Sequence, residues 1–285
     1  MILDCPTAEA LSQVASDDGW TRVAEQQFSG ATLTGLIELG RTVYHGGPQA
    51  RASVEHCLTR LPVAQRMVKN VCSILGGDFD SHRPQTHLFS APEWELWLVR
   101  GTACIESDEF SLYVQRFRRS LAQSGFGLRF PYALSQALTE MTENVVRHSS
   151  MNDNISEPGF VGFHVVRYVM NYVVADLGRG VLKSLRENNK WAHLNTEADA
   201  LVAAAKRGAT RLAQHSEGDG FRLAFQAFLD RQGVIAMRSG DGLARVHGNA
   251  NGREAELSNT AHVPGLRVSA RCNLNGEACE IPFQC

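Results

Sequence analysis

The stretch Glu140-Met-Thr-Glu-Asn-Val-Val-Arg-His148, followed by Asp176-Leu-Gly-Arg-Gly180, carries the most specific fold signal in this chain. The first stretch spaces a carboxylate, an amide and an imidazole four residues apart, so on a helix the three lie along one side. The second ends an apolar run with an acid and two glycines, a pattern typical of a strand followed by a tight turn.

The helical row predicts a site for phosphate chemistry. It lies along the flank of an apolar stripe formed by Leu134, Leu138, Met141 and Val145. Asn144 offers a neutral oxygen ligand to Mg²⁺, an ion that binds proteins mainly through substrate phosphates and water. Glu140 could serve as a general base, and His148 could contact a phosphate or close the helix. A solvated helix face can carry the same spacing, so the row alone does not decide between the two.

The second stretch predicts a pocket for a planar base. Asp176 follows Val-Val-Ala, at the end of a buried strand, where ligands often bind. Its carboxylate could accept a hydrogen bond from the exocyclic amine of adenine, and Gly178 and Gly180 allow a close backbone approach. Farther on, Gly218-Asp-Gly220 precedes a predicted helix and could present backbone amides to phosphate. An ordinary strand-to-helix turn remains the alternative for Asp176.

In this order, the three elements resemble the motifs of the GHKL ATPase superfamily, whose members share the Bergerat ATP-binding fold. Glu140, Asn144 and His148 match the family's first motif, and the turn from Asp176 to Gly180 matches its first glycine box. Gly218 and Gly220 match the second glycine box. The chain looks most similar to stand-alone bacterial members related to anti-sigma-factor kinases, whose lids contain segments like Ser184-Leu-Arg-Glu-Asn188 and Gly208-Ala-Thr210.

The resemblance implies that the chain binds ATP and Mg²⁺. It assigns Glu140 as the catalytic base and Asn144 as the metal ligand. The remaining residues that it assigns to nucleotide binding, together with Asn144, are His148, Asp176, Gly178, Gly180, Thr210, Gly218 and Gly220. One position departs from the family pattern. Leu266 follows Pro264-Gly265 where members commonly carry a threonine that supports adenine.

The order of elements predicts an α+β fold. From residue 93 the pattern reads strand, two helices, two strands, an irregular segment, a helix and three short strands. This order predicts a two-layer sandwich with helices on one face of a mixed sheet, and the resemblance implies the Bergerat fold. We therefore predict a nucleotide-binding domain over residues 91–285, with a loop-dominated lid at about 177–217. Residues 1–90 are predicted to form a mostly helical region.

Composition restricts the class of protein. The chain has 285 residues and a net charge of −2, which provides no general basic field for nucleic acid or an anionic membrane. No apolar run approaches the roughly 20 residues of a membrane span. Seven cysteines are present without a Cys-x-x-Cys pair, and no basic segment precedes an apolar one at the start. We therefore expect a cytoplasmic protein.

These observations leave three functions open. The first is a Mg-dependent ATPase or serine/threonine protein kinase that acts on a protein partner. The second is a non-catalytic switch that changes its affinity for a partner when it binds nucleotide. The third is an interaction protein that has lost nucleotide binding. Residues 1–90 would either dock the protein substrate or form a homodimer surface.

Overall fold

The computed structural model of this chain describes residues 2–3, 7–11, 19–24, 26, 28, 30–58, 87–91, 94–99, 101–148, 158–207, 226, 228, 231–249 and 252–275. No helix in these ranges is long and apolar enough to cross a membrane.

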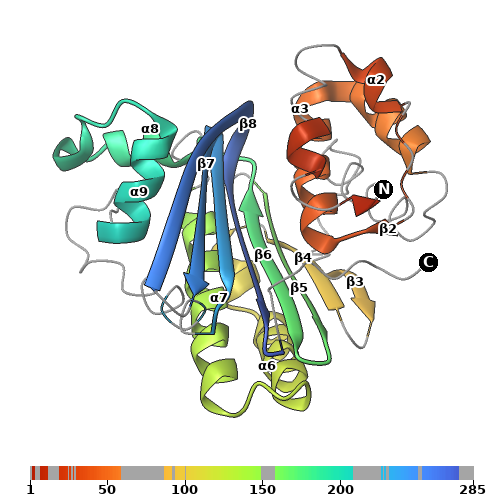
Figure 1. The fold of residues 1–285 in the computed structure, drawn as a ribbon, viewed down its shortest axis with the longest axis vertical. Helices are drawn as coiled ribbons and strands as arrows, with labels where there is room; N and C mark the ends of the chain where they lie inside the picture. Colours follow the sequence, from red (N-terminus) through yellow and green to blue (C-terminus); the bar gives the residue numbers. More distant parts are fainter. Residues whose placement is uncertain are drawn as a thin grey trace.

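A six-stranded sheet forms the centre of the described structure (Figure 1). Its order is β3-β4-β5-β6-β8-β7. The strands are β3 (His87–Ala91), β4 (Trp94–Val99), β5 (Gly159–Val166), β6 (Val169–Asp176), β7 (Val234–Asn249) and β8 (Gly252–Asn273).

All the pairings of this sheet are antiparallel in the described residues, so the prediction of a mixed sheet was wrong. The reason is the path of β8. It returns from the β7 turn and enters the sheet between β6 and β7, with Val174 opposite Val268 and Met237 opposite Val268 on the other side. Strands β6 and β7 run in the same direction, but β8 lies between them, so they do not pair with each other.

The β7–β8 hairpin replaces the three short strands predicted at the end of the chain. Its register runs from Val234 opposite Arg271 to Asn249 opposite Gly252, with irregularities at Gly240 and Gly242. Asn249 and Gly252, the last pair of the register, lie in a segment rich in glycine and asparagine.

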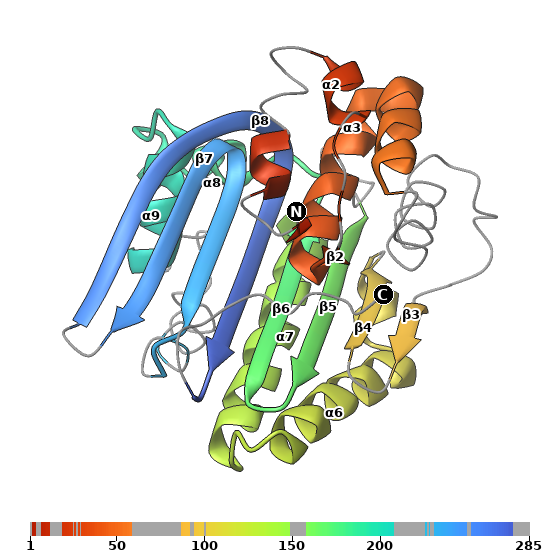
Figure 2. The same cartoon turned by 45° about the vertical axis from the view of Figure 1, so that its right-hand side comes forward.

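Helices α6 (Asp108–Gln123) and α7 (Arg129–His148) cover one face of the sheet (Figure 2). Helix α6 begins where the Ser107 side chain accepts a hydrogen bond from the Phe110 amide, at 3.1 Å. It ends before Gly125, whose φ of 87° belongs to the left-handed region. Buried residues at helical spacing (Phe110, Tyr113, Phe117, Leu121, Leu134, Leu138 and Met141) join the sheet residues of this face in the larger core.

Helix α3 (Leu33–Cys57), which belongs to the N-terminal region, covers the opposite face of the sheet (Figure 2). Helices α6 and α7 lie together on one face, as predicted for the segment from residue 93, and α3 adds a third layer. Strands β4, β5 and β6 are buried along almost their whole length, which means that both faces carry apolar side chains needing cover. Helix α3 supplies that cover through a second core shared with Leu96, Phe160 and Val173. It kinks at Gly47, which has a φ of 70° and precedes Pro48.

Short elements lie beside α3. Strand β1 (Ile2–Leu3) pairs in parallel with β2 (Gly30–Ala31), and α2 (Trp20–Ala24) lies between these two strands in the sequence. Residues 59–86 of the predicted, mostly helical N-terminal region lie outside the described residues.

The segment predicted as a loop-dominated lid is largely helical where the structure describes it. Helices α8 (Val181–Arg186) and α9 (Glu197–Arg207) flank a 3₁₀ turn, η1 (Asn189–Trp191). They share a small core of their own, formed by Leu185, Trp191, Leu194, Ala200 and Ala203. The many polar side chains of this segment hide the helical spacing of its apolar residues in the sequence. Helix α9 nevertheless has an N-cap, because the Thr196 hydroxyl accepts a hydrogen bond from the Asp199 amide. Residues 208–217 lie outside the described structure.

Candidate functional site

Helix α7 places the predicted polar row at the edge of the core, as its spacing indicates. Leu134, Leu138 and Met141 are buried, Asn144 is half-buried and Glu140 is exposed. His148 ends the helix, but its side chain lies outside the described structure, as does that of Val145. The row is therefore a flank between core and solvent, which suits the floor of an open site.

Helix α7 follows strand β6 in the same direction. Near its start, the Tyr168 amide donates to the Ser124 carbonyl oxygen at 3.2 Å, just ahead of α7. Farther along, the Tyr172 hydroxyl lies 3.4 Å from the sulfur of Met141. The next turn of the helix carries Asn144 towards the end of the strand, where Asp176 lies. The fold thus directs both predicted motifs to one end of the same face.

Asp176 is the last residue of β6 and is 5% exposed. Its side chain shares the α7 face of the sheet with Tyr172 and Val174, because alternate residues of a strand face the same way. Its Oδ1 accepts a hydrogen bond from the Gly178 amide at 2.8 Å. A carboxylate held by its own turn is fixed in direction before any ligand arrives.

Gly265 packs directly against Asp176. A Cβ atom at Gly265 would lie 2.1 Å from the Asp176 carbonyl oxygen and 2.9 Å from its Oδ1, and the φ of Gly265 is 83°. Only glycine fits such a position. The next residue along β8, Leu266, is half-buried and packs against the larger core. The wall of the site is therefore apolar where the resemblance led us to expect a threonine hydroxyl.

The glycine turn after Asp176 is fastened to two residues that the sequence did not single out. The Val181 amide donates to the Ser239 hydroxyl at 2.8 Å, and the Leu182 amide donates to Glu197 Oε2 at 3.1 Å. A Cβ at Gly180 would lie 2.9 Å from the Ser239 oxygen. Ser239 and Glu197 thereby satisfy amides at the start of α8 and hold the turn in place.

Glu197 lies against the backbone of β7. Cβ atoms at Gly240 and Gly242 would each lie 2.8 Å from its side-chain carbons. The repeated glycines after Ser239 are the signal that could have revealed this contact, because close backbone approach requires them.

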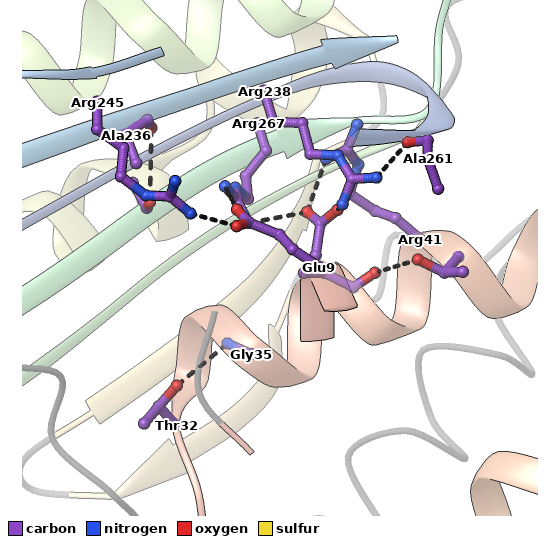
Figure 3. A network of polar contacts seen from close by, with 12 residues as sticks. Glu9, Thr32, Gly35, Arg41, Ala236, Arg238, Arg245, Ala261 and Arg267 are labelled. Atoms are coloured by element: carbon purple, nitrogen blue, oxygen red, sulfur yellow. Dashed lines mark hydrogen bonds and ion pairs between the residues drawn. The ribbon is translucent and has the colours of Figure 1, made fainter. Parts of the chain in front are cut away.

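A buried network of charges lies on the other face of the sheet, between α3 and β7–β8 (Figure 3). Glu38 Oε2 accepts hydrogen bonds from Arg41 Nη1 at 2.9 Å and from Arg267 Nη1 at 3.1 Å. Arg238 pairs with the other oxygen of the same carboxylate. A second carboxylate, Glu9, pairs with Arg267 at 2.7 Å and also with Arg245.

These charges alter the acidity of Glu38. Burial by itself would raise its pKa, but the charges of Arg267, Arg41 and Arg238 outweigh burial and lower the pKa from 4.5 to about 2. Burial lowers the pKa of Arg41, against the opposing charges of Glu38 and, more weakly, Asp176. The sequence indicates this buried network only through Glu38, an acid inside the apolar segment Leu36-Ile-Glu-Leu39.

The network reaches the candidate site through Arg41. Its Nη2 donates to the carbonyl oxygen of Pro264 at 2.8 Å, and Pro264 precedes the glycine that packs on Asp176. The N-terminal helix α3 thus supports the turn that forms one wall of the site.

Three predicted binding residues, Thr210, Gly218 and Gly220, lie outside the described residues. Within the described ranges, no group of three or more His, Cys, Asp or Glu side chains could hold a metal ion. A magnesium ion at Asn144 would therefore have to share its coordination with phosphate oxygens and water, as this ion commonly does.

No protein-family model matches this chain, and a search of curated proteins finds no match either.

Proposed function

We propose that this chain is an ATP-binding protein of the GHKL type, acting as a Mg-dependent ATPase or as a serine/threonine kinase on a protein partner. The observation that carries the proposal is the setting of Asp176. Its carboxylate is buried at a strand end, fixed by the Gly178 amide and backed by the Gly265 backbone. A preformed acceptor between glycines suits the amine edge of a purine.

The residues of α7 would act on the phosphates. Asn144 would hold the metal ion, which supplies charge neutralisation to the phosphate oxygens when it is bound. Glu140, one helical turn earlier, would accept a proton from the attacking water or from a partner's hydroxyl. Its exposure suits a group that must meet a second substrate.

Thermal unfolding in the presence of nucleotides tests the binding proposal. Mg-ATP at about 100 times its dissociation constant should stabilise the protein by about 2.7 kcal/mol. Mg-GTP should give a smaller shift, since it lacks the exocyclic amine at the matching position. Asp176→Asn should remove this preference for adenine. If neither ATP nor ADP changes the melting temperature, the proposal fails and an interaction protein without nucleotide is favoured.

Turnover needs a separate test with a matched control. Glu140→Gln should leave the ATP-induced shift intact and abolish phosphate release or transfer. Glu143→Gln changes a neighbouring, half-buried carboxylate of the same helix and should retain activity. Equal loss of activity in both variants would contradict the assignment of Glu140 as the base.

The second candidate function is a non-catalytic switch, and the contacts of α8 favour it. Because Ser239 and Glu197 hold the start of α8, a ligand that moves the glycine turn must also move α8 and its neighbour α9. An ATP-induced thermal shift without phosphate release, accompanied by changed protease cleavage within residues 181–207, would support the switch over the enzyme.

A further inference from the structure

We propose that the end of the molecule opposite the α8–α9 pair binds an acidic, partly apolar segment of a partner protein. The surface, here called the basic end, consists of Arg118, Leu128, Arg129, Tyr132, Arg167 and Tyr168. It lies where α6 turns into α7 and where β5 turns into β6 (Figure 1). The proposal does not depend on nucleotide binding.

The two turns form one continuous surface. The Tyr168 amide donates to the carbonyl oxygen of Ser124 at 3.2 Å, which ties the hairpin to the end of α6. The ring of Tyr168 lies over Gly125, where a Cβ would come within 2.6 Å of it. On the helices, the Arg118 guanidinium lies 5.2 Å from the centroid of the Tyr132 ring. Figure 2 shows the hairpin tip and the helical turn at the same end.

Among the described residues, three of the five large apolar side chains that are exposed lie here. Leu128 is 87% exposed, Tyr132 54% and Tyr168 47%. Single exposed apolar side chains are ordinary in folded proteins. Several of them on two adjoining turns and the start of α7 indicate a binding surface, because burying them against a partner removes apolar area from water.

Charge identifies the chemistry of the partner. Arg118, Arg129 and Arg167 are exposed, and none of them forms an ion pair with another described residue. The stretches 112–135 and 165–170 contain arginines and no aspartate or glutamate. The whole chain has a net charge of −2, so this positive charge is a local feature. A negatively charged segment is the complement of such a surface.

The hairpin turn carries backbone strain. Arg167 and Tyr168 have φ values of 34° and 36°, in the left-handed region that two-residue hairpin turns usually fill with Asn-Gly. Each such residue costs roughly 1–2 kcal/mol relative to a relaxed conformation. The turn therefore presents an arginine and a tyrosine at the expense of stability, as binding sites often do.

A protein segment fits this surface better than nucleic acid does. Nucleic acids are held by an extended basic stripe that neutralises many phosphates. The basic end instead combines three arginines with Leu128 and two tyrosines over two turns and the adjoining parts of α6 and α7. Acidic side chains would meet the arginines, and apolar side chains between them would cover the leucine and the rings.

A labelled peptide in which glutamates alternate with leucine and phenylalanine is the probe. Its control is the same peptide with glutamine in place of glutamate. We expect saturable binding of the acidic peptide and at least about tenfold weaker binding of the neutral one, a difference near 1.4 kcal/mol. The double variant Arg129→Glu and Arg167→Glu should weaken binding by about tenfold or more. The double variant Leu128→Ser and Tyr132→Ser should weaken binding to a similar extent. Lys183→Glu changes an exposed charge on α8 and is the matched control, which should bind normally.

Several results would overturn the proposal. They are equal binding of both peptides, binding unaffected by charge reversal, or stronger binding of single-stranded DNA or anionic vesicles than of the acidic peptide. If Glu277→Gln combined with Glu280→Gln tightens peptide binding, the chain's own acids compete for the surface and a partner segment is not its occupant. Should the double arginine variant not fold by circular dichroism, Arg118→Glu gives the same comparison on a helix surface.

Discussion

Replacing Glu38 with glutamine tests the physics of the buried network most directly. The carboxylate is fully buried and faces the guanidinium groups of Arg41, Arg238 and Arg267. Glutamine preserves the size of the side chain but removes its charge. Three buried cations would then face a neutral amide, and the free energy of unfolding should fall.

The magnitude follows from the pKa of Glu38. Its decrease from 4.5 to about 2 corresponds to about 3 kcal/mol, at 1.36 kcal/mol per pKa unit. Removing one partner of a buried ion pair costs about 3–5 kcal/mol in other proteins, which agrees. Because the folded pKa is depressed, this stabilisation is complete above pH 4.5 and is lost as the pH falls through about 2.

Urea denaturation of wild type and variant across this pH range measures the effect. Glu38→Gln should lose about 3–5 kcal/mol at neutral pH, and its difference from wild type should shrink as the pH falls below 4.5. Glu95→Gln is the control, because its partner Arg116 is 41% exposed and can be solvated instead. We expect it to lose only about 1–2 kcal/mol. Equal losses in the two variants, or a loss below about 1 kcal/mol at Glu38, would refute the reasoning.

Three further predictions follow from single contacts. Gly265→Ala should destabilise the protein by more than about 2 kcal/mol in urea, since its Cβ would collide with the last residue of β6. Gly127→Ala, with a φ of 73° but open space around it, should cost only about 1–2 kcal/mol, and a larger effect there would contradict the steric argument. Ser239→Ala should leave the Val181 amide without its acceptor, lower the free energy of unfolding by about 1 kcal/mol and speed amide hydrogen exchange in α8. Unchanged exchange would show that the hydroxyl does not hold the helix. Burial raises the pKa of Cys57 to about 12. Iodoacetamide should therefore alkylate this thiol far more slowly at pH 8 in the folded protein than in the unfolded protein. Similar rates would show that the thiol is accessible.

The sequence predicted the elements with strong periodicity. Helices α6 and α7 and strands β5 and β6 followed from apolar spacing. The order of the strands could not be predicted from the sequence, because no local feature of β8 indicates that it pairs with both β6 and β7. Strands β4, β5 and β6 are apolar on both sides, a pattern that indicates that both faces of the sheet are covered. Helix α3 provides the cover on the second face.

The candidate site was predictable only where its residues are neighbours in sequence. Asp176 and its glycine turn could be recognised because the carboxylate and the Gly178 amide are two residues apart. Ser239 and Glu197 could not be found in this way, since each meets α8 only after the hairpin and α9 have packed together. The support given by Arg41 depends on a contact with Pro264 across most of the chain, which periodicity does not encode.

The position of β8 also sets the order in which the molecule can be completed on the ribosome. Strand β6 emerges together with its partner β5, but its other edge must wait for β8, whose pairing residues follow α8, α9 and the whole of β7. Until then an apolar strand has an unpaired edge, the kind of surface through which nascent chains associate with one another. We expect that slow elongation before residue 273 would favour aggregation, and that chaperones would bind the nascent chain during this interval.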